Sequence, residues 1–201
     1  MADYQLHCFA QSGNAYKVAL MLALTGASWE PVFVDFFNGE TRGARFRTDI
    51  NEMGEVPVLV HEGKKLTQSG AILTMLADRT GKFGGDADAR HEILRWILFD
   101  NHKLTSYLAT FRFFNAFAKP LDPIVMDFLR GRVRSGLGIV EKHLGAQPFI
   151  VGNEATIADF SLLRIFVLPG RRVRLRHCAG KPGDRRLACA YQGPARLGAS
   201  L

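Results

Sequence analysis

The first part of the chain alternates between short β-type runs and helical spacing of apolar residues. Residues 4–9 are β-prone and partly alternating, and a turn-like Gln-Ser-Gly follows them. Apolar residues then recur at helical spacing over 18–24 and stop at Gly26. Residues 29–36 predict a second strand, with Pro31 at an edge or outside the ladder. This βαβ order predicts parallel strands joined by a right-handed crossover.

The pattern up to about residue 80 completes a small α/β unit. A polar stretch, interpreted as an irregular loop with a short helix, is followed by a strand, a hairpin-like turn, a short antiparallel strand and a further helix. We expect these five segments at residues 38–52, 56–60, 62–64, 65–67 and 68–81.

The second half of the chain carries helical periodicity. Residues 81–88 are rich in Gly and Asp and form a credible linker. Long helical patterns follow at 89–118 and 122–144, with a Lys-Pro break between them. Thr156 and Asp159 have the spacing of a capping box, which predicts the start of another helix. We therefore expect an all-helical second domain.

The net charge of +7 belongs to the C-terminal tail. From Arg164 onward there are nine Lys and Arg residues against one acid, which leaves residues 1–163 with 17 basic and 18 acidic residues. The tail shifts abruptly to Arg, Gly, Pro and Ala, which favours translation in a shifted reading frame over a natural variant tail. Comparison of the other two frames of the coding DNA would decide. After Phe166 near its start, Tyr191 is the one aromatic residue among its charges, so we expect no nucleic-acid partner.

Cysteine usage and hydropathy indicate the compartment. Three widely spaced cysteines fit neither a disulfide framework nor a zinc cluster, so we expect no metal and a reducing cytoplasm. No run approaches the roughly 18 apolar residues of a membrane span, and the first residues lack a secretory pattern. We expect a soluble protein without a membrane partner.

The ordered set of motifs in residues 4–163 resembles the cytosolic glutathione transferases, of bacterial type. The set comprises the βαβ-ββα order, Val-Pro opening the third strand, Gln-Ser opening the next helix, a linker, long helices and Gly-x-x-x-Thr-Ile-Ala-Asp. The resemblance implies a thioredoxin-like α/β N-terminal domain, an all-α C-terminal domain and a homodimer. The implied domains are a glutathione-binding domain (1–80), a linker (81–88), an incomplete helical domain (89–163) and a basic tail unlike the family (164–201).

The resemblance also implies a function. It is conjugation of the thiol of reduced glutathione to small hydrophobic electrophiles, a detoxification reaction with glutathione as co-substrate and no other cofactor. The alternative is a non-catalytic glutathione-binding or interaction protein, because the last helices of the family are missing from this sequence.

The implied reaction requires a hydroxyl that stabilises the glutathione thiolate. A free thiol has a pKa of about 8.5, and lowering it by about two units requires roughly 2.7 kcal/mol in favour of the anion. One charge-assisted hydrogen bond supplies about 1.5 to 3 kcal/mol, so one hydroxyl beside a helix N-terminus suffices. By the resemblance Ser12 is the candidate catalytic residue, with Asn14 and the amide of Gly13 as rivals. From the residues alone, Ser12 is more simply an N-cap.

Four further residues are implied to bind glutathione. In resembling proteins the bond between Val56 and Pro57 is cis, which leaves the main chain of Val56 free to pair with the peptide in the manner of an added strand. Gln68 and Ser69 are implied to hold the γ-glutamyl end at a helix N-terminus. The alternatives are a plain strand-entry proline, an N-cap role for Ser69 and a solvated Gln68.

The electrophile pocket is expected between the two domains. Candidate lining residues are Phe9 after the first strand and Tyr107, Phe111 and Phe114 on the first long helix. An aromatic stripe at helical spacing is more often core than pocket, so both interpretations stay open.

Two other polar or reactive groups receive structural interpretations. The mid-helix Asp100, Asn101 and His102 require water, a partner subunit or a ligand, and a solvated face is the simpler outcome. Cys8 lies within the first strand and is interpreted as a small core residue. The turn after that strand has no Cys-x-x-Cys, so thiol–disulfide exchange is not expected.

Overall fold

The computed structural model describes residues 2–119 and 121–163, so the predictions for the basic tail lie outside the described residues. The strands are β1 (Tyr4–Cys8), β2 (Trp29–Phe33), β3 (Val58–His61) and β4 (Lys64–Thr67). The helices are α1 (Gly13–Thr25), the 3-10 turn η1 (Glu40–Arg42), α2 (Ala44–Asp49), α3 (Ser69–Thr80), α4 (Arg90–Phe99), the π-helical segment η2 (Asp100–Thr105), α5 (Ser106–Ala116), α6 (Pro123–Leu144) and α7 (Ile157–Leu162).

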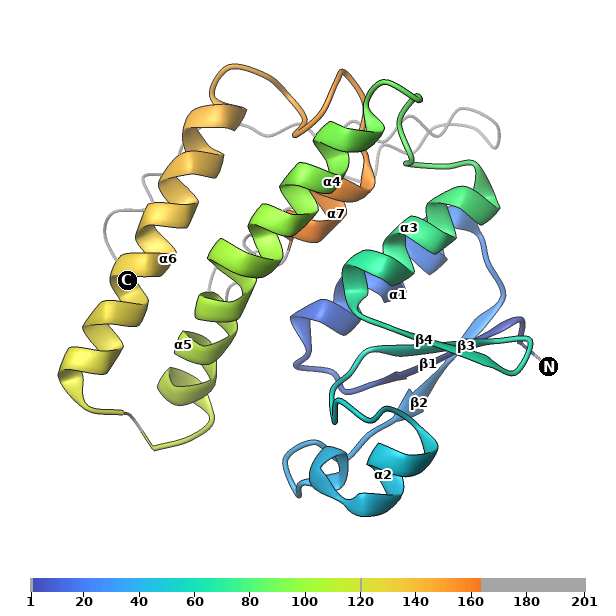
Figure 1. Ribbon diagram of the computed structural model, residues 1–201, viewed down its shortest axis with the longest axis vertical. Helices are drawn as coiled ribbons and strands as arrows, with labels where there is room; N and C mark the ends of the chain where they lie inside the picture. Colours follow the sequence, from blue (N-terminus) through green and yellow to red (C-terminus); the bar gives the residue numbers. More distant parts are fainter. Residues whose placement is uncertain (1, 120, 164–201) are drawn as a thin grey trace, which may run out of the picture.

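The four strands form one mixed sheet in the order β2-β1-β3-β4. β1 is parallel to β2 and antiparallel to β3, and β3 is antiparallel to β4. Helices α1 and α3 cover one face of the sheet, and α2 lies on the other side (Figure 1). This is the thioredoxin-like α/β arrangement that the sequence predicts.

Local interactions explain where helix α1 begins and where it ends. Ser12 has an extended backbone, and its hydroxyl accepts a hydrogen bond from the amide of Ala15 at 3.2 Å, as an N-cap does. Gly26 closes the helix with φ of 77°, which a residue without Cβ adopts at little cost. The N-cap interpretation of Ser12 is therefore confirmed. It leaves the proposed catalytic role untouched.

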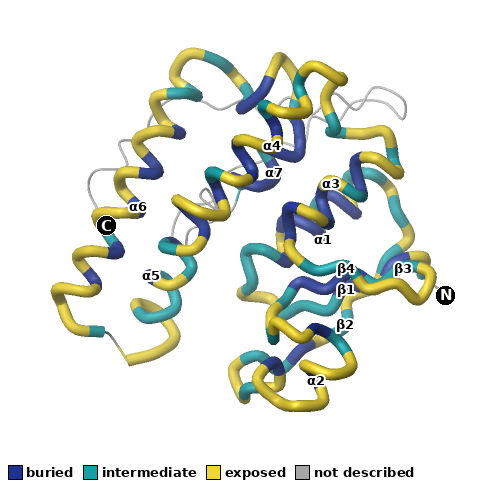
Figure 2. The backbone as a smooth tube through the Cα atoms, in the orientation of Figure 1, coloured by how far each residue is buried: buried dark blue, intermediate teal, exposed yellow. Residues whose placement is uncertain are grey.

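The core lies between the sheet and the helices of both parts of the chain. Buried positions of α1, α3, α4 and α7 face one another, whereas α2 is largely exposed (Figure 2). Completely buried side chains come from the strands, from α1 and α3, and from η2 and α7; they include Leu6, Val18, Leu22, Ile72, Leu76 and Leu104. A single apolar cluster therefore continues from the sheet into the helical domain.

The helix predicted over residues 89–118 is three segments, because a π-helical stretch separates α4 from α5. The prediction of a solvated face is wrong for Asp100, whose side chain is only 1% exposed and is paired with Lys17. It holds for Asn101 and His102, which are exposed.

Helices α3 and α4 approach closely at Gly70. A Cβ at this position would lie 2.8 Å from Cγ2 of Ile97 and 3.4 Å from Nδ2 of Asn101. Since Ile97 is buried and β-branched, the added methyl would push the two helices apart.

We therefore expect Gly70→Ala to lower the free energy of unfolding by about 1 to 2 kcal/mol, measured by urea denaturation. The matched control is Gly131→Ala on α6, where a Cβ meets nothing within 4 Å. This control should gain about 0.5 to 1 kcal/mol, because alanine is the better helix former. Equal effects at the two positions would contradict the close-contact explanation.

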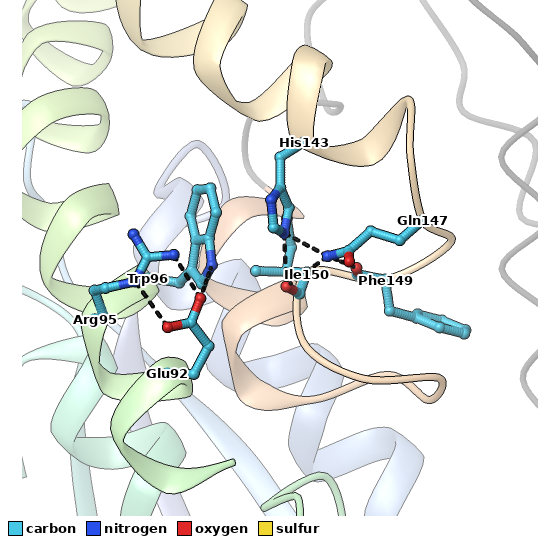
Figure 3. Close-up of polar contacts among 7 residues, drawn as sticks. All are labelled: Glu92, Arg95, Trp96, His143, Gln147, Phe149 and Ile150. Carbon is cyan, nitrogen blue, oxygen red and sulfur yellow. Dashed lines mark hydrogen bonds and ion pairs between the residues drawn. The ribbon is translucent and has the colours of Figure 1, made fainter.

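The loop between α6 and α7 is held by hydrogen bonds to its main chain (Figure 3). Nε2 of His143 lies 2.8 Å from the carbonyl oxygen of Ile150, and the side-chain amide of Gln147 donates to the carbonyls of Phe149 and Ile150. The His143 ring also contacts Trp96 of α4, with ring centroids 4.4 Å apart. These contacts fix the path by which the chain enters α7.

The predicted capping box at the start of α7 is confirmed. Asp159 accepts hydrogen bonds from the amide and the hydroxyl of Thr156, at 2.8 and 3.1 Å. Within the described part of the chain, no helix combines the length and the apolar character needed to cross a membrane.

Candidate functional site

Three chain segments meet at one end of the sheet because of the strand register. Val58, the first residue of β3, is paired with His7 near the end of β1 and with Thr67 at the end of β4. The N-terminus of α1, which follows β1, therefore lies near Pro57, and so does the N-terminus of α3, which follows β4. This end of the sheet contains all the residues that the sequence implied for glutathione.

The N-terminus of α1 presents hydrogen-bond donors at this end of the sheet. The Ser12 hydroxyl accepts from Ala15, which leaves its own proton free to donate to a ligand. Gly13 and Asn14 occupy the first helical turn, where amides have no partner within the helix. The side-chain oxygen of Asn14 is inaccessible to solvent and has no hydrogen-bond partner among the described residues. A polar ligand group at this position would satisfy atoms that the folded chain leaves unpaired.

The second segment is the bond between Val56 and Pro57, which is cis. Val56 lies just before the first residue pair of the β3 ladder. Among residues 2–119 and 121–163, its main-chain N–H and C=O have no main-chain partner. An extended peptide can therefore pair with this residue without displacing an existing bond.

The third segment is the start of α3. Gln68 is the N-cap residue with φ of 65°, an unusual value for a residue with a Cβ, and Ser69 is the first helical residue. The alternative of an N-cap role is thus wrong for Ser69. The alternative of a solvated Gln68 holds, because Gln68 is exposed while its amide donates to Oε2 of Glu55 at 3.1 Å. The Ser69 hydroxyl makes no hydrogen bond to another described residue, although the residue is only 6% exposed.

Aromatic rings border the site on the side of the helical domain. Phe9, whose carbonyl accepts from the Ser12 amide at 3.0 Å, stacks on Phe36 with centroids 4.5 Å apart. Phe36 in turn contacts Phe113 of α5 edge to face. Phe37 and Phe117 extend the cluster. These rings form an apolar wall that spans both domains.

The sequence found only Phe9 of this cluster. Tyr107 contacts Phe128 of α6, and Phe111 is buried in the helical core. Phe114 packs partly buried against the core and contacts Phe113. These three residues therefore pack in or against the helical core, which is the core alternative that the sequence left open. Phe113, which contacts Phe36 of the sheet domain, lies on another face of α5.

Cys8, the cysteine within the described residues, is not activated. Burial raises the pKa of the Cys8 thiol at the end of β1, which favours the neutral thiol over the nucleophilic thiolate. The neighbouring His7 has its pKa lowered, first by burial and then by the positive charge of Lys65. The Cys8 thiol therefore lacks the lowered pKa of a redox-active cysteine, and the charged form of His7 that would favour a thiolate is itself disfavoured.

The chain is similar in sequence to known proteins. The family model for the "Glutathione S-transferase, N-terminal domain" matches residues 4–78. Glutathione S-transferase 2 of Schizosaccharomyces pombe is 30% identical over 173 residues, which are 81% of this chain and 74% of the relative.

Solved structures show the same fold. A glutathione S-transferase from Pseudomonas fluorescens Pf-5 superposes with a TM-score of 0.74 at 32% identity, over 81% of this chain and 82% of that chain. The glutathione transferase URE2P6 from Phanerochaete chrysosporium, in complex with oxidized glutathione, gives a TM-score of 0.75 at 25% identity, over 84% of this chain and 83% of that chain.

The fold and these matches define a thioredoxin-like domain joined to a helical domain. The chain belongs to the glutathione transferase family.

Proposed function

We propose that the protein is a glutathione transferase that conjugates reduced glutathione to small hydrophobic electrophiles. The observation that carries this proposal is the convergence of Ser12, Val56 and Ser69 at one end of the sheet, where each has unused hydrogen-bonding capacity. The electrophile would lie against the aromatic wall that begins at Phe9.

In this proposal the chain stabilises an anion and orients two reactants. The Ser12 hydroxyl and the amides of Gly13 and Asn14 favour the thiolate, and the proton of the thiol is released to solvent. The sulfur then forms a bond to the electrophilic carbon, and a leaving group departs with its bonding electrons. Val56 next to Pro57 would pair with the glutathione main chain, and Gln68 and Ser69 would hold its γ-glutamyl end.

The test uses the full chain in two assays. The first follows thermal unfolding with and without millimolar reduced glutathione, because a ligand that binds only the folded state raises the midpoint. The second measures turnover with glutathione and a generic aromatic halide. Binding with turnover supports the proposal, and binding without turnover supports the alternative of a non-catalytic glutathione-binding protein. Absence of both would overturn the proposal.

Ser69→Ala should weaken glutathione binding about tenfold, since a hydrogen bond to a charged group contributes about 1.5 kcal/mol or more. Isothermal titration of the full chain measures the dissociation constant. The control is Ser106→Ala on α5, an exposed serine whose hydroxyl donates to the carbonyl of His102. Equal affinities for both variants would remove Ser69 from the site.

The homodimer and the cytoplasmic location implied by the resemblance remain part of the proposal. Sedimentation of the full chain would test the homodimer directly.

A further inference from the structure

A buried charge network joins α1 to the helical domain. The Lys17 side chain is completely buried, and its Nζ lies 2.8 Å from Oδ2 of Asp100, which is 1% exposed. Asp100 also accepts from the hydroxyls of Thr105 and Ser161, each at 2.6 Å. The Asp100 carboxylate therefore accepts hydrogen bonds from side chains of α1, η2 and α7.

The π-helical segment makes this arrangement possible. In an α-helix, residues five positions apart point about 140° away from each other, since each residue turns the chain by about 100°. A π-turn bonds i to i+5, so Asp100 and Thr105 come onto one face and share a hydrogen bond. The irregular turn thus places a fully hydrogen-bonded carboxylate where α1 presents its lysine.

The pair is placed to control the end of α1 that carries the proposed site. Lys17 lies in α1, five residues after Ser12, which is the N-cap of that helix. The ion pair fixes the rotation and height of that helix against η2, which continues directly into α5. The same α5 carries Phe113, which contacts Phe36 of the aromatic wall. The buried ion pair therefore fixes the position of the Ser12 hydroxyl relative to the aromatic wall.

We propose that Lys17 and Asp100 are positioning residues that hold the Ser12 hydroxyl in place for the glutathione sulfur. The inference rests on the proposed transferase function. A buried ion pair contributes little net stability compared with apolar residues of similar size, but its directional bonds select one arrangement. Apolar packing between α1 and η2 would allow small rotations of α1 that the four-residue network forbids.

The test is the full chain with the charge-free pair Lys17→Met/Asp100→Leu, which leaves no unpaired buried charge. We expect a cooperative unfolding transition close to that of the wild type. We also expect kcat to fall about tenfold with less than a twofold change in KM for glutathione, because one unit in the pKa of the bound thiol corresponds to about a factor of ten. Thiolate absorbance against pH should show that pKa about one unit higher.

Two further variants keep the inference falsifiable if the double variant does not fold. Thr105→Val retains both charges and removes one hydrogen bond to Asp100, and it should shift the pH profile in the same direction by about a third as much. Lys17→Arg keeps the charge and should recover part of the wild-type profile. Asp127→Leu, which removes an exposed carboxylate paired with Arg130 on α6, is the charge-removal control.

The outcomes separate the two proposals. Suppose that the wild type turns over, and that the folded double variant or the Thr105→Val variant has an unchanged pH profile and kcat. This result overturns the positioning role and leaves the transferase function standing. A wild type that neither binds glutathione nor turns over overturns the transferase function, and the positioning role falls with it.

Discussion

Ser12→Ala should lower kcat about 10- to 100-fold while KM for glutathione changes little. The reason is that a charge-assisted hydrogen bond to the thiolate contributes about 1.5 to 3 kcal/mol, and each 1.36 kcal/mol corresponds to about a factor of ten. The pKa of bound glutathione should rise toward the free value of about 8.5. Thiolate absorbance of the complex as a function of pH and steady-state kinetics measure the two effects.

The N-cap role of Ser12 requires its own control, because the hydroxyl accepts from Ala15. Alanine at an N-cap costs about 1 kcal/mol of stability, whereas glycine costs only a few tenths. Ser12→Gly should therefore remain nearly as stable as the wild type and still lose turnover as Ser12→Ala does. If both variants retain turnover and the wild-type thiol pKa, the assignment moves to Asn14, whose side-chain NH2 group can donate a hydrogen bond to the thiolate.

The sequence predicted those parts of the fold that depend on local signals. Ser12 before α1, Gly26 after it and the capping box of Thr156 and Asp159 each satisfy helix-end groups within a few residues. The order of strands and helices follows from the alternation of two hydrophobic periods. Such features are visible in a single chain because the atoms involved are neighbours in sequence.

What the sequence missed depends on contacts between distant segments. The break between α4 and α5 lies around a carboxylate bonded to Lys17, 83 positions earlier in the chain. A mid-helix aspartate in isolation predicts a solvated face, and only the approach of α1 shows that it is buried. Likewise, β2 ends at Phe33 rather than at the predicted Phe36, and the chain then turns so that Phe36 meets Phe9 and Phe113. Helical or strand spacing alone cannot predict that meeting.

Asp159→Ala should lower the free energy of unfolding by about 2 to 4 kcal/mol, more than the loss of an ordinary cap. The carboxylate accepts from the amides of Thr156 and Ile150, at 2.8 and 2.9 Å. Each buried amide left without a partner costs about 1 to 3 kcal/mol. The Ile150 carbonyl is hydrogen-bonded to His143 and Gln147 (Figure 3), so Ile150 links the end of α6 to Asp159 in α7. The variant therefore loosens the loop at this residue. Denaturant unfolding followed by tryptophan fluorescence measures the effect, since Trp96 contacts His143.

The pH dependence and a control make this last prediction specific. Burial raises the pKa of the Asp159 carboxyl, against the lowering effect of its hydrogen bonds. The folded chain therefore holds this proton more tightly than the unfolded chain, whose Asp pKa is about 3.9. The stability that Asp159 contributes should be fully present below that pH and decrease as the pH rises through the raised folded-state pKa. Asp159→Asn, which does not titrate, should lack this decrease.

The control for the loss of stability is Glu154→Ala in the same loop, at an exposed position. Its free energy of unfolding should stay within about 0.5 kcal/mol of the wild type, and an equal loss at both positions would contradict the capping role.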